Sequence, residues 1–336
     1  MALRTPAFRL IRDGATLPAS SYTRRARIGS RTITDLIDVG RVYDHFAEGA
    51  TIVLQGLHRY WTPVAQLCRA LEDRLTHPIQ ANAYITPPVG QGLRVHADAH
   101  DVFALQTHGT KQWVIYADAA DPEPDGAGAT PTMDIRLATG DCLYLPKGVH
   151  HAARTVDHPS IHLTLGVRTI TWADVLSGVL DRAGDLAALQ QPLQAGFAHD
   201  PDALAEEAAK HLDGIIAHLR GADAGAAVER TARGFQRGRI PALAGQLGEL
   251  LTLDDIDDAT VVRRRPHRTP TVAEHDGTVS MELGDRSLHL PAWVAAALRH
   301  AAASTELAPR DLSGHLDEPG RLTLVRRLVR EGLFTR

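Results

Sequence analysis

With 336 residues, the chain is long enough for two or three domains, each with its own core. Its net charge of −4 gives no positive field that would gather nucleic acid or anionic lipid, and no apolar run is long enough to span a membrane. The first residues lack the apolar run of a secretory signal, and the two cysteines are too few for a disulfide framework or a cysteine-rich zinc site. We therefore expect a cytoplasmic protein.

The first 80 residues predict a mixture of helix and strand. Residues 35–56 indicate a short helix that is followed by a buried strand, because a polar segment gives way to the apolar run 51–56. Residues 62–75 carry apolar side chains at helical spacing, with acidic and basic pairs between them. This pattern predicts an amphipathic helix.

From residue 80 to about residue 170, the sequence changes to short β-like runs that are separated by Pro/Gly turns. A loop is expected at 118–133. Many short strands at this spacing are typical of an antiparallel barrel or sandwich. The predicted strands are 80–87, 92–98, 102–109, 111–117, 141–146 and 160–168.

After about residue 172 the strand pattern stops and segments rich in Ala and Leu follow. Their apolar spacing predicts amphipathic helices that form a helical bundle or a dimerisation module, although packing on the barrel could bury the same faces. The predicted helices are 172–190, 202–219 and 242–251.

The polar segment 261–277 predicts a boundary, and its residues Arg263, Arg264 and Arg265 predict a solvated linker rather than an RNA contact. Residues 278–290 then indicate a hairpin that turns at Gly284-Asp285. A helix is expected to start with Pro291 at its first position, and another helix is expected at 318–334. A hairpin with short helices resembles a winged-helix domain.

The most distinctive local pattern is His96-x-Asp98. Residues i and i+2 of a strand point to the same face, so an imidazole and a carboxylate would project together. A further histidine follows the turn at Pro146 and Gly148, either His150 or His151. Two histidines and one carboxylate leave metal positions open, as non-haem Fe(II) oxygenases require. The His-x-Asp pair alone is weak evidence, because 18 histidines produce such pairs by chance.

The amino-acid sequence of residues 82–116, 140–152 and 160–167 resembles that of the JmjC-type ribosomal oxygenases, which are 2-oxoglutarate-dependent protein hydroxylases of the cupin superfamily. The resemblance implies an α+β fold with a double-stranded β-helix barrel, a helical dimerisation region and a C-terminal winged-helix-like domain. It places the metal on His96, Asp98 and His151 and leaves His150 as a bystander. The implied divisions are a catalytic domain 1–172, a helical domain 173–252 and a winged-helix-like domain 253–336.

The resemblance also implies a cosubstrate site. The family places a Lys or Arg fifteen residues after the first metal ligand, which is Lys111 here, to pair with the distal carboxylate of 2-oxoglutarate. Asn82 and Tyr84 share a strand face and line the pocket in the family. His162 and Thr164 form a similar pair on a neighbouring strand. Two alternatives stay open: Lys111 as a solvated strand residue, and His162 as a packed core histidine.

The reaction that the resemblance implies is hydroxylation by Fe(II), O₂ and 2-oxoglutarate of a protein side chain, an Arg or a His of a ribosomal protein. Other candidate substrates are a peptide natural product or a small molecule. A second class of function is a non-catalytic regulator in which a cupin senses a ligand and a winged helix binds DNA. Residues 241–336 contain 12 Arg, no Lys and 14 acidic residues. Because a DNA-binding domain is expected to be basic, we expect no direct nucleic-acid partner. A homodimer is expected through the helical region.

Overall fold

The computed structural model describes residues 4–336 apart from 89, 117–130, 185, 188, 194, 196, 200 and 242. The chain divides into two compact units, Met1–Thr169 and Ile170–Arg336. Among the described residues, none of the helices is long and apolar enough to cross a bilayer. The division into three domains that the sequence predicts is finer than these two units and stays a prediction.

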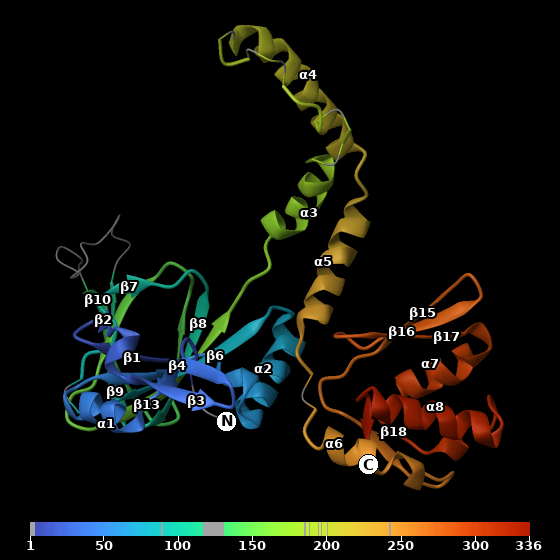
Figure 1. The fold of residues 1–336 in the computed structure, drawn as a ribbon, viewed down its shortest axis with the longest axis horizontal. Helices are drawn as coiled ribbons and strands as arrows, with labels where there is room; N and C mark the ends of the chain where they lie inside the picture. Colours follow the sequence, from blue (N-terminus) through green and yellow to red (C-terminus); the bar gives the residue numbers. More distant parts are fainter. Residues whose placement is uncertain are drawn as a thin grey trace. The chain divides into compact units, whose positions relative to one another are not determined.

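The N-terminal unit is built on two antiparallel sheets (Figure 1). The larger sheet has the strand order β11-β8-β13-β6-β5-β1-β2, and the smaller sheet has the order β10-β9-β12-β7. A separate hairpin joins β3 and β4. The strands are β1 (Phe8–Arg12), β2 (Ala15–Thr16), β3 (Thr23–Ile28), β4 (Arg31–Ile37), β5 (Thr51–Leu54), β6 (Ile79–Thr86), β7 (His96–Ala97), β8 (Asp101–His108), β9 (Thr110–Tyr116), β10 (Pro131–Ala138), β11 (Cys142–Leu145), β12 (His150–Arg154) and β13 (Ser160–Val167).

Alternation along the strands places one core between the two sheets. Val102 and Ala104 are buried residues of β8 in the larger sheet, where they cluster with Leu145 of β11. Trp113 of β9 and Leu137 of β10 join the same cluster from the smaller sheet. Because every second residue of a strand faces the same side, the residues between them face away from this core, and Phe103 packs on a separate apolar cluster.

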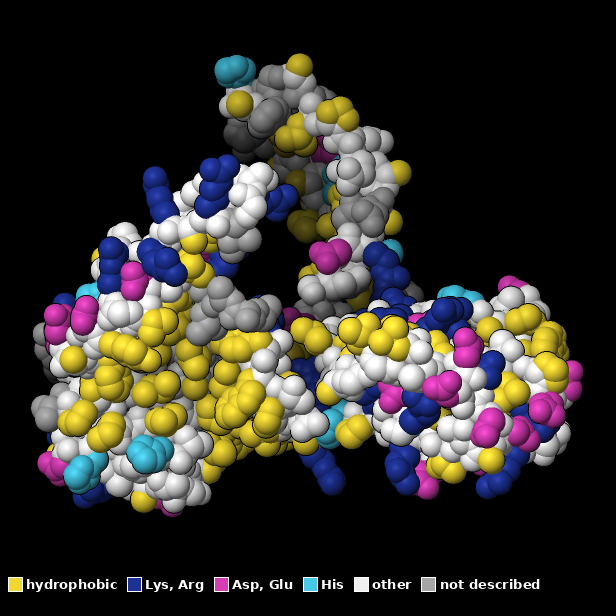
Figure 2. All heavy atoms as spheres, turned by 60° about the horizontal axis from the view of Figure 1, so that its bottom comes forward, with side chains coloured by type: hydrophobic (Ala, Val, Ile, Leu, Met, Phe, Trp, Pro, Cys, Tyr) yellow, Lys and Arg dark blue, Asp and Glu magenta, His cyan; other side chains and the backbone are white. Residues whose placement is uncertain are grey.

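Two helices lie outside the strands, and both were predicted. Helix α1 (Val39–Ala47) begins after Asp38, whose carboxylate accepts a hydrogen bond from a backbone N–H of the first turn. Helix α2 (Thr62–Leu75) buries Val64 and Cys68, four residues apart, against apolar residues of β6 and β13. Figure 2 shows hydrophobic side chains gathered on one face of the N-terminal unit.

The predicted strands of this unit are confirmed, although 92–98 contributes only the two residues of β7. The sequence did not predict the strands β1 to β4, β10 and β12. Strand β12 contains two histidines and two alanines, which lack strong β propensity, and it forms because it pairs with β9 and β7. The expected loop 118–133 is wrong at its end, because β10 begins at Pro131, and residues 117–130 lie outside the described residues.

The C-terminal unit begins with helices and continues with two small sheets, of orders β18-β14-β19 and β15-β16-β17. Its helices are α3 (Trp172–Gly184), α4 (Pro201–Arg220), α5 (Ala224–Gly238), α6 (Gln246–Leu251), α7 (Ala295–Ala303) and α8 (Glu318–Arg330). Its strands are β14 (Val262–Arg264), β15 (Thr271–His275), β16 (Thr278–Glu282), β17 (Ser287–Pro291), β18 (Glu306–Leu307) and β19 (Phe334–Thr335). Helix α5 was not predicted.

One apolar core holds the sheets, α7 and α8 together (Figure 1). Met281 of β16, Leu298 of α7 and Leu328 of α8 are all fully buried in it. The predicted hairpin is confirmed: β16 and β17 pair across a turn in which Gly284 has a φ of +89°, a conformation that glycine adopts without strain.

The predicted solvated linker at Arg263–Arg265 is wrong. Strand β14 covers its first two residues, and Arg264 donates to the carbonyl oxygens of Ala302 and Ser304. Arg265 is only 5% exposed and donates to the carbonyl oxygen of Ala244. The guanidinium groups of Arg264 and Arg265 therefore satisfy backbone carbonyls of the core, whereas Arg263 stays exposed and pairs with Glu306. The helix expected to start at Pro291 is also corrected, because that proline ends β17 and α7 begins four residues later.

Candidate metal centre

The pairing of β7 with β12 brings the three predicted metal ligands together. His96 lies directly opposite His151 in this antiparallel pair, and their ring centroids are 4.5 Å apart. Asp98 follows β7, and its Oδ2 is 3.7 Å from Nε2 of His151. One ligand atom from each residue can be chosen so that all lie within 4.8 Å of one another. In the described part of the chain, this is the one group of three such side chains that could hold a metal ion.

Backbone carbonyls orient both imidazoles. Nδ1 of His96 lies 2.8 Å from the carbonyl oxygen of Arg94, and Nδ1 of His151 lies 3.0 Å from that of Val149. A ring nitrogen that faces a carbonyl oxygen carries the proton, so Nε2 of each ring keeps its lone pair. This arrangement is typical of metal-binding histidines, because the second hydrogen bond fixes both the tautomer and the ring.

Burial supports the choice of His151 over its neighbour His150. His151 is 4% exposed, and burial lowers the pKa of its imidazole below the ordinary value, opposed in part by the hydrogen bond to Val149. A neutral imidazole is the form that binds a metal. Successive residues of a strand face opposite sides, so His150, which is paired with Ala97, points to the other face.

Lys111 of β9 is a buried cation near these residues, with an exposure of 2%. Its Nζ donates to Oγ1 of Thr86 at 3.0 Å and lies 3.4 Å from Nδ1 of His162. No carboxylate pairs with it among the described residues, and burial lowers its pKa to about 7. Because a buried charge without a counter-charge is costly, the pocket favours an anionic ligand beside Lys111. The alternative of a solvated strand residue is wrong.

Aromatic rings enclose His162. Its ring stacks on Tyr84 at a centroid distance of 4.8 Å and an angle of 5°, and Trp113 meets it edge-on at 5.4 Å. Burial, followed by the positive charge of Lys111, holds the pKa of His162 well below its ordinary value. His162 is therefore neutral, and its Nδ1 can accept a hydrogen bond from Lys111. It is both a packed residue and a neighbour of the buried cation.

The remaining predicted residues share one face of two paired strands. Thr164 of β13 is opposite Asn82 of β6, and Oδ1 of Asn82 accepts a hydrogen bond from the backbone N–H of Gly56 at 2.9 Å. This bond leaves the amide N–H groups of Asn82 as donors for the pocket. Thr86, which accepts the hydrogen bond from Lys111, was not identified from the sequence as part of the site. It follows Asn82 and Tyr84 at the same two-residue interval, so one further step of the alternation would have found it.

All eight predicted residues line one cavity, together with Trp113 and His100. Trp113 belongs to the core between the sheets and also stacks on His151, with ring centroids 5.8 Å apart. Nε2 of His100 lies 3.1 Å from Nε2 of Gln80. The enclosed part of the cavity measures about 60 Å³, which is room for a few waters.

The family model of the JmjC domain matches residues 55–175, the segment that contains every side chain of the cavity. This segment is a JmjC domain. Mouse ribosomal oxygenase 2 is 32% identical over 245 residues, which are 70% of this chain and 48% of that protein. The bifunctional lysine-specific demethylase and histidyl-hydroxylase NO66 of Dictyostelium discoideum is 34% identical over 158 residues, 44% of this chain and 31% of that protein. The chain thus spans less than half of the length of these relatives.

Solved structures of the Escherichia coli ribosomal oxygenase YcfD share the fold. The complex with cobalt and succinic acid has a TM-score of 0.53 at 18% identity and covers 98% of this chain and 86% of that chain. The complex with cobalt and 2-oxoglutarate has a TM-score of 0.51. The predicted resemblance to JmjC-type ribosomal oxygenases is confirmed, as is the JmjC/cupin fold with its mixture of helix and sheet.

Proposed function

We propose that the chain is an Fe(II)- and 2-oxoglutarate-dependent oxygenase that hydroxylates a protein side chain. One observation carries the proposal: a His/Asp/His group with two carbonyl-oriented imidazoles shares a cavity with a buried ammonium that has no carboxylate partner among the described residues. The names of the relatives, which include a histidyl-hydroxylase and ribosomal oxygenases, support the same activity.

His96, Asp98 and His151 would hold the iron through two Nε2 atoms and one carboxylate oxygen. This donor set fits Fe(II), because a two-histidine, one-carboxylate face leaves positions open for other ligands. A bound Fe(II) supplies the activation of O₂, in a reaction that converts 2-oxoglutarate to succinate and CO₂. The chain's part is to fix the rings and to keep the open positions free of further protein ligands.

Lys111 and Thr86 would bind the distal carboxylate of 2-oxoglutarate, because the ammonium and the hydroxyl both offer protons in a dry pocket. Asn82 and Thr164 would add hydrogen bonds from the neighbouring strands. Tyr84 and His162 would form an apolar wall with their stacked rings. Burial raises the pKa of Tyr84, so its hydroxyl stays a neutral donor.

The proposed substrate is an Arg or a His of a ribosomal protein, in line with the relatives named ribosomal oxygenases. A peptide natural product or a small molecule is the second candidate, because the cavity itself holds no group that selects a protein chain. A non-catalytic regulator is the third, and the 14 acidic residues against 12 Arg in residues 241–336 disfavour the DNA binding that it requires.

The test of the proposal is a reaction with cell lysate. The purified protein is loaded with Fe(II) and 2-oxoglutarate without oxygen, mixed with lysate and exposed to O₂, and peptides are searched for the mass gain of one oxygen atom. His151→Ala should abolish both succinate release and the modification. His150→Ala is the matched control, because this neighbouring histidine faces the other side of β12 and should keep most of the activity.

Two results would contradict the proposal. The first is equal loss of activity in the two histidine variants, which would remove the assignment of the third ligand. The second is unchanged turnover without succinate in Lys111→Ala, which would show that the cupin uses its metal without 2-oxoglutarate.

We also propose a homodimer that forms through the helical region. Trp172, Leu176 and Leu180 of α3 are exposed, with 74%, 54% and 51% of their surfaces accessible. They line an apolar hollow of about 340 Å³ together with residues from the end of α4 and the start of α5. Apolar residues at this exposure indicate a covering partner. The three domains 1–172, 173–252 and 253–336, with the last one winged-helix-like, and a cytoplasmic location belong to the same proposal.

A further inference from the structure

A second cavity lies in the C-terminal unit and forms a groove along α8. Its volume is about 610 Å³, which is within the range of ligand sites in proteins. One wall is the end of β17 with the short 3₁₀ helix that follows it, η5 (Ala292–Val294). The opposite wall is the 3₁₀ helix η4 (Leu253–Asp255). None of these residues belongs to the metal centre.

The groove is shaped for an elongated apolar ligand. Residues of α8 line it at intervals of three and four, from Pro319 through Thr323 to Arg330, so the groove follows one face of the helix. This stretch measures about 16 Å at the helical rise. Leu290 and Leu324 supply apolar surface, and Trp293 is 70% exposed at the wall. Exposed aromatic residues of this kind are enriched where proteins bind partners.

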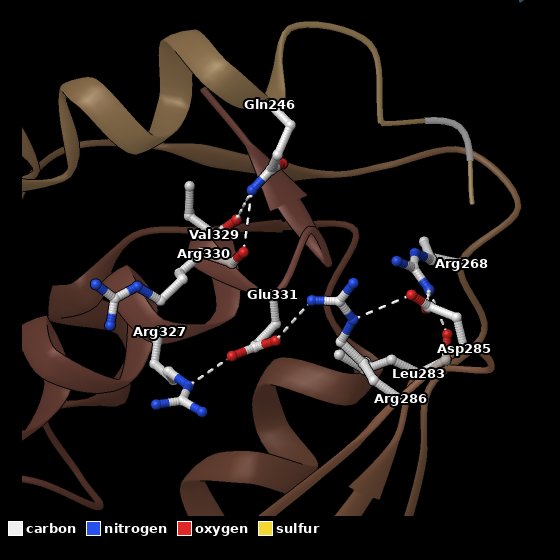
Figure 3. A network of polar contacts seen from close by, with 9 residues as sticks. All are labelled: Gln246, Arg268, Leu283, Asp285, Arg286, Arg327, Val329, Arg330 and Glu331. Atoms are coloured by element: carbon white, nitrogen blue, oxygen red, sulfur yellow. Dashed lines mark hydrogen bonds and ion pairs between the residues drawn. The ribbon is translucent and has the colours of Figure 1, made fainter. Parts of the chain in front are cut away.

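The groove also carries positive charge. Arg326, Arg327 and Arg330 line it against one acidic residue, Asp254. Arg326 donates to two backbone carbonyls of the segment before β14, and its Nε is buried without a hydrogen-bond partner. Arg327 is held by Glu331, which also binds a second arginine (Figure 3).

Arg330 is exposed on the same helix, and no side-chain partner of its guanidinium is found among the described residues. Gln246 donates to the backbone carbonyls of Val329 and Arg330 and so fixes the end of α8 (Figure 3). The arginines at this end of the groove thus belong to a helix whose last turn is fixed by the hydrogen bonds from Gln246. Arg330 can meet an acidic group from outside, and the exposed Arg327 can share its charge between Glu331 and such a group.

We propose that this groove binds an acidic amphipathic helix of another protein. Apolar side chains of that helix would cover Trp293 and Leu324, and its carboxylates would meet Arg327 and Arg330. Charge decides the chemistry of the partner. The groove is lined by three arginines and one carboxylate, and although Arg327 is paired with Glu331, Arg330 keeps a charge that attracts a carboxylate and repels a basic segment.

The test uses fluorescein-labelled peptides of about 14 residues, which is close to four helical turns. One peptide has leucines on one face and glutamates on the other, and the second peptide has lysines in place of the glutamates. Fluorescence anisotropy with the full chain should show binding of the Leu/Glu peptide in the micromolar range. The Leu/Lys peptide should bind at least about tenfold more weakly, because its charges face the arginines.

Three substitutions in the groove and one control substitution outside it locate the binding. Arg330→Glu and Trp293→Ser change exposed residues of the groove, so the fold should be retained. Each should lower the affinity for the Leu/Glu peptide by about tenfold or more. Arg330→Lys should restore most of the affinity, because the charge is kept. Arg233→Glu on α5 is the matched control, since this arginine is exposed but lies outside the groove, and it should leave the affinity within about twofold.

Several outcomes would overturn the proposal. These are no binding of the Leu/Glu peptide at millimolar concentration, equal binding of the two peptides, or equal effects of Arg330→Glu and Arg233→Glu. Displacement of the peptide by decanoate at a lower concentration would assign the groove to a small carboxylate. Salt-sensitive binding of duplex DNA that Arg330→Glu abolishes would assign it to nucleic acid. Each result is independent of the hydroxylation assay, which reports on the N-terminal unit alone.

Discussion

Lys111 differs from the other cations of the chain in identity and in surroundings. The sequence contains 36 Lys and Arg residues, of which Lys occurs only at 111, 147 and 210. An ammonium can lose its proton in a dry site far more readily than a guanidinium. Burial lowers the pKa of Lys111 to about 7, so the ligand-free protein is a mixture of charged and neutral forms at neutral pH.

This property predicts that the affinity for 2-oxoglutarate depends on pH. A bound carboxylate favours the charged ammonium, so binding takes up a proton wherever the ligand-free Lys111 is neutral. The affinity for 2-oxoglutarate should therefore be highest below pH 7. Above pH 7 it should fall as pH rises, by a factor that approaches about tenfold per pH unit. Calorimetry between about pH 6 and about pH 9, in buffers of different ionisation enthalpy, measures both the affinity and the proton uptake.

Lys111→Arg is the control for this prediction, because a guanidinium stays charged throughout the range. Its affinity should change little with pH, even if the larger side chain weakens binding. A flat profile in the unchanged protein, with no proton uptake, would contradict the assignment of Lys111 as the group that pairs with the cosubstrate.

At the residue scale, local spacing predicted much of the candidate site. Alternation predicted that Asn82 and Tyr84 share a face, and the structure places both in the cavity. Thr86 was missed because a threonine in a strand carries no distinctive signal, and its role depends on Lys111 from a strand 25 residues away. Sequence alone could not predict that no carboxylate of the described residues lies beside Lys111, because only the fold decides which residues surround it.

At the scale of elements, the turn between β8 and β9 fixes where Lys111 enters the cavity. Gly109 has a φ of +64° in this turn, and a Cβ atom there would collide with the carbonyl oxygen of Pro159. Gly140 has a φ of +100°, and nothing lies within 4 Å of its added Cβ. An alanine at Gly109 would therefore suffer both backbone strain and a steric clash, whereas an alanine at Gly140 would suffer only backbone strain.

We predict that Gly109→Ala lowers the free energy of unfolding by about 3 kcal/mol or more, because backbone strain and collision with a backbone atom combine. Gly140→Ala should cost only about 1 kcal/mol, since only the strain remains. Urea unfolding of the two variants measures the difference. Equal costs would show that β9 and the segment around Pro159 can move apart, and that the turn does not fix the position of Lys111.

Elements with a strong local pattern were predicted, and elements formed by distant pairing were not. The amphipathic helix α2 and the hairpin β16–β17 show their periodicity and their turn in sequence, and both are confirmed. Strand β12 depends on β7 and β9, which lie more than 30 residues earlier. Arg264 and Arg265 indicated a solvated linker because sequence does not show which backbone carbonyls need a donor.

At the scale of the whole molecule, the exposed apolar face of α3 predicts self-association. Leu180→Glu places a charge on this face and should shift the protein from dimer to monomer at micromolar concentration, as measured by sedimentation velocity. Asp181→Lys is the matched control, because it changes an exposed residue of α3 that lies outside the apolar hollow. A monomer in the unchanged protein would remove the dimer proposal.

The JmjC/cupin fold was predicted through resemblance, and the place where the chain divides was predicted through pattern. The change from strands to helices near residue 172 is visible in composition, and the two compact units divide close to it, after Thr169. The groove along α8 was not predicted. It requires η4, η5 and one face of α8 to meet, although they are separated by tens of residues in the sequence.

The buried ammonium of Lys111, which has no carboxylate partner in the described part of the chain, has a consequence for the amount of this protein in the cell. A ligand that binds only the folded form raises its stability by about 2.7 kcal/mol at a hundred times its dissociation constant. A carboxylate that completes the cavity would thus protect the JmjC domain from unfolding and from proteolysis. Under the proposed function, the amount of folded enzyme would follow the abundance of 2-oxoglutarate, so that metabolic state would set how much catalyst persists as well as how fast it works.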